Sequence, residues 1–202
     1  MRKFFDKLGN IPTLIVVGVL AVVPMIVYEI NAVMHGDFYY FPLDICLIIL
    51  YGALATFAIM KNKVATLGLF TVLLGAYLIG CTSSGIFEIM DGVNAIKANE
   101  DFGAIHILTG LVNAFFAIGI IIFVIGKYFL TGNKTVLINI MLTCFCLTVI
   151  GNIVVFIMCF PADFYVGSNG SIDVISVIYG FGQIFAPFLF LCTGSIAESL
   201  NK

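Results

Sequence analysis

The composition of this 202-residue chain indicates a membrane protein, because 62% of its residues are hydrophobic and only 10% are charged. Soluble domains carry roughly 25% charged residues. The formal net charge is -2, and no basic stripe with interleaved aromatic residues is present. Nucleic acid is therefore set aside as a partner, and membrane lipid is the expected surrounding of the chain.

Six apolar segments follow one another, each near or above the roughly 20 residues that a helix needs to cross the hydrocarbon core of a bilayer. The connections between them are short, so no soluble domain is expected. The sequence predicts an all-α, polytopic membrane protein in which residues 1–202 form a single six-helix transmembrane bundle. The expected spans are 11–30, 42–60, 64–89, 102–130, 135–160 and 172–197.

Basic residues fall almost entirely on one side of this predicted bundle, and loops rich in lysine and arginine remain in the cytoplasm. Only Lys97 lies on the opposite side, where acidic residues collect. The sequence therefore predicts that both termini are cytoplasmic. The basic residues of the cytoplasmic side are Arg2, Lys3, Lys7, Lys61, Lys63, Lys127, Lys134 and Lys202.

The six cysteines all fall inside apolar segments or at their ends, whereas a disulfide framework places cysteines in loops. We interpret them as small apolar side chains. A disulfide between Cys46 and Cys159, near one membrane face, is the alternative.

Polar side chains recur at helical spacing in the last three spans. An amide that faced lipid would lack hydrogen-bond partners, so these faces are expected to turn inward. They can serve as interhelical contacts only, or they can line a site. The positions are His106, Thr109, Gly110, Asn113 and Ala117 in span four, Cys144, Thr148, Asn152 and Cys159 in span five, and Ser176, Tyr179, Gly180, Gln183 and Pro187 in span six.

The strongest candidate site lies at the outer ends of spans three and four, where His106 is expected within reach of Glu88 and Asp91. Ionisable groups inside a membrane are costly and therefore mark function by default. Glu88 is expected at the C-terminal end of its helix, where a carboxylate opposes the helix dipole. A histidine that only packs between helices is the alternative.

From these residues we expect an outward-facing polar pocket between spans three to six that binds or moves a lipid or a small solute. Its proposed lining is Glu88, His106, Asp91, Ser83, Ser84, Thr109, Asn113, Asn152, Tyr179 and Gln183.

A metal-dependent lipid hydrolase is the alternative function. Catalytic zinc sites use about three protein ligands, typically three histidines or two with a carboxylate. The chain has 2 histidines, of which His35 is expected in the outer loop before span two. His35, His106 and Asp91 would form the minimal set, and the main interpretation contains no metal and no cofactor.

Three features of spans three and four carry a resemblance to a known family: Gly85-Ile86-Phe87 at the end of span three, Asp91 just beyond it, and Ile105-His106 at the start of span four. This pattern resembles a family of six-span prokaryotic membrane proteins without an assigned reaction, distantly similar to the FRAG/DRAM/Sfk group. Glu88 replaces the proline that usually follows the phenylalanine in that family. The resemblance implies a compact six-helix protein of a bacterial or archaeal cytoplasmic membrane, with a role in lipid handling or trafficking.

Overall fold

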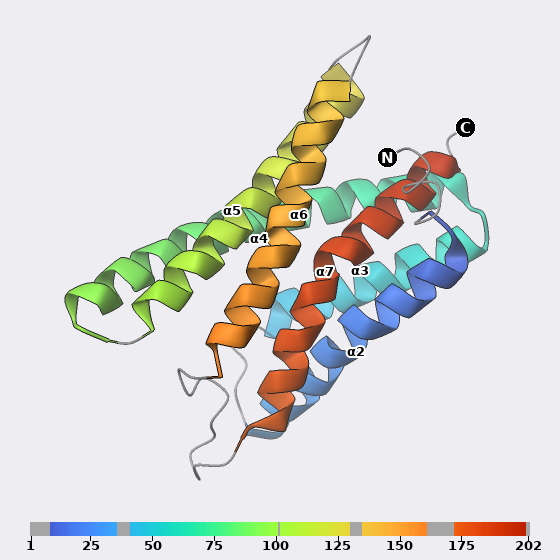
Figure 1. Cartoon of the computed structure of the whole chain (residues 1–202). Coiled ribbons are helices and arrows are strands. Elements are labelled where there is room, and N and C mark those ends of the chain that lie inside the picture. Colours follow the sequence, from blue (N-terminus) through green and yellow to red (C-terminus); the bar gives the residue numbers. More distant parts are fainter. Residues whose placement is uncertain (1–8, 36–40, 101, 130–134, 161–171, 201–202) are drawn as a thin grey trace. The chain divides into compact units, whose positions relative to one another are not determined.

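The computed structural model describes residues 9–35, 41–100, 102–129, 135–160 and 172–200, and every element in them is a helix. Five of these helices (α2, α4, α5, α6 and α7) are long and apolar enough to cross a membrane, judged by length and composition. The predicted all-α class is confirmed. In chain order (Figure 1) the elements are α2 (Ile11–His35), α3 (Phe41–Ile59), α4 (Lys63–Lys97), α5 (Gly103–Val124), the π-helix η1 (Ile125–Phe129), α6 (Thr135–Met158) and α7 (Val174–Ser199).

The second predicted span, 42–60, corresponds to α3, which has 19 residues. Among the residues whose side chains the structure describes, its apolar stretch covers only Ile45–Ile59. A span count of six therefore stays a prediction.

Polar side chains begin three of the helices in the way that helix capping requires. At the start of α2 the side chain of Asn10 accepts a hydrogen bond from the backbone N–H of Thr13 at 2.8 Å. At the start of α4 the side chain of Asn62 accepts one from the backbone N–H of Ala65 at 3.2 Å. Asp173 accepts the backbone N–H of Ile175 at 3.0 Å. This acid is an N-cap, so it is accounted for without a further role.

Helix α4 differs most from its predicted boundaries, because it runs to Lys97 instead of ending at residue 89. The apolar run of the sequence stops, but the helix continues. Gly92 and Ala95 remain buried within this extension, while its polar residues Asp91, Asn94 and Lys97 are exposed. The helix ends where Asn99 adopts a left-handed conformation with φ 57°, a usual helix terminator.

Two further boundaries need correction. His35, expected in a loop, is the last residue of α2. Span four, expected to reach residue 130, ends as an α-helix at Val124 and continues as the π-helix η1.

All six cysteines are thiols, and four of them (Cys81, Cys144, Cys159 and Cys192) are buried. The interpretation of cysteines as small core side chains fits these buried positions, whereas the alternative of a disulfide between Cys46 and Cys159 stays a prediction.

The chain divides into two compact units, Met1–Leu73 with Gly167–Lys202, and Leu74–Val166. The first unit pairs α2 with α7 in an antiparallel arrangement (Figure 1), since Gly18 lies near Leu189 and Tyr28 stacks on Tyr179 with ring centroids 4.3 Å apart. Phe70, from the first part of α4, lies against Phe190 of α7 with centroids 5.7 Å apart.

The second unit contains the rest of α4 together with α5, η1 and α6. Helices α5 and α6 are antiparallel neighbours, and Gly151 allows close contact with the side chain of Val112. An aromatic row joins the three helices of this unit, with Phe116 between Tyr77 at 5.3 Å and Phe145 at 5.6 Å. Through Phe116, α5 therefore contacts both α4 and α6.

Candidate functional site

The candidate site lies on the hairpin of α4 and α5, and four glycines set its geometry. A Cβ atom built on Gly92 would lie 2.7 Å from the carbonyl oxygen of Gly103, and one built on Gly110 would lie 2.8 Å from that of Gly85. Real Cβ atoms do not approach backbone oxygens so closely, so only glycine permits this separation. The two helices are in backbone contact at two levels.

The spacing of these glycines explains why the contact repeats. Gly85 and Gly92 are seven residues apart on α4, and Gly103 and Gly110 are seven residues apart on α5. Seven residues are close to two turns of an α-helix, so both pairs fall on one face of each helix. Antiparallel pairing then aligns Gly92 with Gly103 and Gly85 with Gly110.

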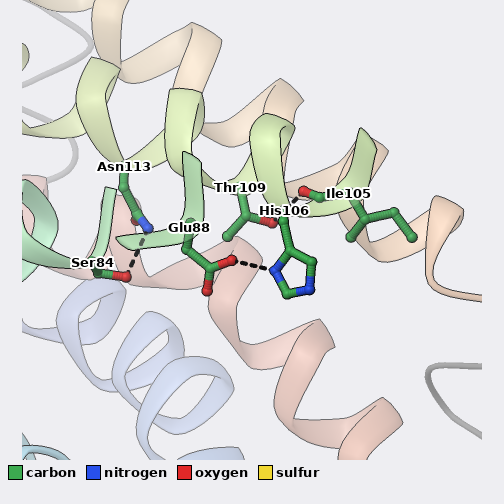
Figure 2. Close-up of polar contacts among 6 residues, drawn as sticks. All are labelled: Ser84, Glu88, Ile105, His106, Thr109 and Asn113. Atoms are coloured by element: carbon green, nitrogen blue, oxygen red, sulfur yellow. Dashed lines mark hydrogen bonds and ion pairs between the residues drawn. The ribbon is translucent and has the colours of Figure 1, made fainter. Parts of the chain in front are cut away.

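The glycine contact between α4 and α5 has an apolar flank and a polar flank. Ile89 and Ile96 cover Gly110 and Gly103 on one flank. On the level between the two glycine pairs, Nδ1 of His106 lies 2.7 Å from Oε2 of Glu88. Figure 2 shows the carboxylate pointing at the imidazole ring. The expected contact between Glu88 and His106 is thus present, and it joins residues on two helices.

When Glu88 is ionised, its contact with Nδ1 determines which tautomer His106 adopts. An ionised carboxylate has no proton and only accepts hydrogen bonds. Nδ1 of His106 must therefore carry the proton and donate it to Glu88. The second ring nitrogen, Nε2, is turned away from Glu88 in Figure 2.

A second polar contact between the helices lies further along the hairpin. The amide Nδ2 of Asn113 donates a hydrogen bond to Oγ of Ser84 at 3.2 Å. Both polar contacts appear in Figure 2 between the same two helices. Ser84 and Glu88 are four residues apart on α4, so they share a face of that helix.

Two other predicted site residues use their hydroxyl groups locally. Ser83 donates to the carbonyl oxygen of Ile79 at 2.8 Å, and Thr109 donates to that of Ile105 at 2.9 Å. Such bonds to the preceding turn satisfy a hydroxyl in an apolar helix. Thr109 still lies beside His106 in Figure 2, whereas Ser83 is exposed on α4.

The pair is only partly shielded from its surroundings, since the side chains of His106 and Glu88 keep 30% and 27% of their surface exposed. Asp91, three residues after Glu88, is exposed. This position places Asp91 on the same side of α4 as Glu88. The hairpin therefore presents two carboxylates and one imidazole along one flank.

One argument for Glu88 from the sequence is wrong. Glu88 was expected at the C-terminal end of its helix, opposing the helix dipole, but α4 continues for more than two turns to Lys97. The dipole effect is confined to the last turn. That turn holds Lys97, whose positive charge is favourable there.

Three other predicted site residues lie outside this hairpin. Asn152 is half-buried on α6, next to the glycine that contacts Val112. Tyr179 and Gln183 belong to the first unit, where Tyr179 stacks on Tyr28. The polar contacts of this site that the structure describes lie on the α4–α5 flank, and a part for Asn152, Tyr179 and Gln183 stays a prediction.

The metal alternative gains no support from the described residues. Among them, no group of three or more histidine, cysteine, aspartate and glutamate side chains is placed to hold a metal ion. His106 and Asp91 are included in that search, while the side chain of His35 lies outside the described part of the structure.

Sequence reasoning missed one buried acidic residue, Glu29. It is only 3% exposed, inside α2. The spacing of apolar residues along α2 could have predicted that Glu29 is buried. Leu14, Ala21 and Met25 are buried at spacings of seven and four residues, and Glu29 is the next position of that stripe.

Comparison of the chain with protein-family models, curated proteins and solved structures gives no match. The resemblance of spans three and four to a six-span prokaryotic family therefore stays a prediction. Fold and site define the class of protein, an α-helical chain with five helices able to cross a membrane and a polar helical hairpin.

Proposed function

We propose that the protein is a non-enzymatic membrane protein whose α4–α5 hairpin binds the polar part of a lipid or a small solute. One observation carries the proposal: Glu88 and His106 form a partly exposed hydrogen-bonded pair at 2.7 Å between two apolar helices. Charged residues make up 10% of the chain. A pair retained at such a place is a candidate binding group.

The surrounding groups add hydrogen-bonding capacity to this pair. Ser84, Asn113 and Asp91 supply a hydroxyl, an amide and a second carboxylate along the same hairpin. The close glycine contact supports precise placement, because helices in backbone contact leave little freedom to the side chains at their seam. A binding site of this kind requires no covalent step.

The ligand that accompanies the purified protein provides the test. We expect organic extraction and mass spectrometry to find a retained compound with the wild-type protein and much less of it with Glu88→Gln and His106→Gln. Glu100→Gln is the matched control, since Glu100 is an exposed acid in the turn after α4. Equal retention by all four proteins would refute the binding function.

For the arrangement in the membrane we propose six spans with both termini in the cytoplasm. The eight-to-one division of basic residues supports this orientation. An alkaline phosphatase fusion after Lys134 should be inactive, because that loop would be cytoplasmic. An active fusion would overturn the orientation.

A further inference from the structure

We infer that the polar contacts of the α4–α5 hairpin form a site with one open end, whose floor is the aromatic row of Tyr77, Phe116 and Phe145. A ligand enters and leaves at the end of the hairpin that carries Asp91, and the row blocks its passage to the other membrane face. This inference rests on the proposed binding function and specifies how the ligand reaches the site.

The order of side chains along α4 shows where its polar contacts end. Tyr77, Ser84, Glu88 and Asp91 follow one another at spacings of seven, four and three residues, which place them on one face of the helix. Ser84 and Glu88 make the polar contacts with α5 (Figure 2), and Asp91 is exposed. Tyr77 lies about two turns before Ser84 and contacts Phe116. The polar series on α4 therefore has an aromatic ring at its inner end.

Helix α5 shows the same order of polar and apolar residues. His106 and Asn113 make its polar contacts, and their face continues with Ala117 and Ile120, four and seven residues after Asn113. Both residues are buried, with exposed fractions of 6% and 0%. Residues 114–125 are glycine or apolar at every position. The polar face of α5 therefore ends at Asn113.

The three rings of the aromatic row come from three different helices. Phe116 lies between Tyr77 and Phe145, with ring centroids 5.3 Å and 5.6 Å from its own. Phe116 and Phe145 are only 4% and 2% exposed. Phe116 follows Asn113 by three residues, about 4.5 Å along the helix axis. The row therefore lies directly beyond the hydrogen bond between Asn113 and Ser84.

A polar ligand loses its hydrogen-bond partners at this row. On the side of Asp91, hydroxyl, amide, carboxylate and imidazole groups can replace the water that the ligand gives up. Beyond the row, the same face of α5 offers Ala117 and Ile120, and a polar group buried there without a partner is costly. Rings packed at the density of a protein core also leave no room for a solute. The hairpin is therefore suited to binding from one side.

The experiment maps the access of water with a membrane-impermeant, positively charged methanethiosulfonate reagent. The full-length protein is studied in sealed membrane vesicles of both orientations, with the reagent outside. Labelling is quantified for each cysteine-containing peptide by mass spectrometry, so the native cysteines are recorded separately. Three single substitutions supply the new thiols: Asn94→Cys in the exposed end of α4, Ser84→Cys at the polar contact, and Ile120→Cys beyond the row.

We expect Ser84→Cys to be labelled from the same side as Asn94→Cys and not from the other side. Ile120→Cys should be labelled from neither side. When Phe116→Ala removes the central ring, Ile120→Cys should become labelled from the side that labels Asn94→Cys, because water then passes the row. Phe115→Ala is the matched control, since it removes the neighbouring half-buried ring of α5 outside the row. It should leave Ile120→Cys unlabelled.

Three results would overturn the inference. The first is labelling of Ser84→Cys from both sides or from neither, and the second is labelling of Ile120→Cys while the row is intact. The third is equal protection of Ile120→Cys in Phe116→Ala and Phe115→Ala. If Phe116→Ala does not fold, Tyr77→Ala removes the half-buried ring of the row instead, and the same gain of labelling is expected.

The labelling pattern is independent of the natural ligand, because the reagent itself is the probe. Labelling of Ser84→Cys from both sides overturns the closed floor and leaves the binding function standing. Labelling from one side, together with equal ligand retention by the wild type, Glu88→Gln, His106→Gln and Glu100→Gln, refutes the binding function and leaves the closed floor standing. The two ideas can therefore fail separately.

Discussion

The close contact between α4 and α5 at Gly92 can be tested by adding a single methyl group. In Gly92→Ala the new Cβ would lie 2.6 Å from Cγ1 of Ile107, 2.7 Å from the carbonyl oxygen of Gly103 and 2.9 Å from the backbone nitrogen of Ile107. Two of these three atoms belong to the backbone of α5. They cannot yield by a rotamer change, so the helices must separate.

The size of the effect follows from two opposing terms. Overpacking of a tight contact costs roughly 1–3 kcal/mol, whereas replacing glycine by alanine inside a helix contributes up to about 1 kcal/mol of stability. We therefore expect Gly92→Ala to lower the free energy of unfolding by about 1 kcal/mol. Separation of the helices should also lengthen the 2.7 Å contact between Glu88 and His106.

Gly80→Ala is the matched control on the same helix. A Cβ atom on Gly80 would meet nothing within 4 Å, so only the helix-propensity term applies. We expect Gly80→Ala to be as stable as the wild type or slightly more stable. The assay is unfolding in mixed detergent micelles, together with the ¹⁵N chemical shift of Nδ1 in His106. If Gly92→Ala matches Gly80→Ala in both measurements, the backbone contact is wrong.

Three other predictions use the same unfolding assay. A double-mutant cycle of Ser84→Ala and Asn113→Ala should give a coupling of about 0.6 kcal/mol, the average for interhelical hydrogen bonds in membranes, and a coupling of zero would exclude the bond. Glu29→Lys should cost roughly 3 kcal/mol or more because a longer cation enters a buried position, whereas Glu100→Lys at an exposed position should change little. Phe145→Ala removes a ring that is 2% exposed and should lower the free energy of unfolding by about 3 kcal/mol, the low end of the range for soluble cores. The low end applies because lipid, instead of water, surrounds the unfolded helices. A cost below about 1 kcal/mol would contradict the core position of Phe145.

The sequence alone was sufficient to predict the features of the structure that depend on local composition. The long apolar segments produce helices because a backbone in lipid must satisfy its hydrogen bonds within one segment. An acid directly before an apolar run is a usual helix start, and Asp173 caps α7. The approach of Glu88 to His106 also followed from the sequence, because both residues lie at similar depth on consecutive antiparallel helices.

Tertiary packing decided what composition does not encode. Hydropathy ends near residue 89, but α4 continues to Lys97 because its glycine face still contacts α5. The pairing of Gly85 with Gly110 and of Gly92 with Gly103 depends on how two helices are rotated toward each other, which neither segment specifies by itself. The same rotation places Ser84 opposite Asn113. Glu29 is buried for a similar reason, since the stripe of α2 that carries it acquires its partners only when the helices of its unit assemble.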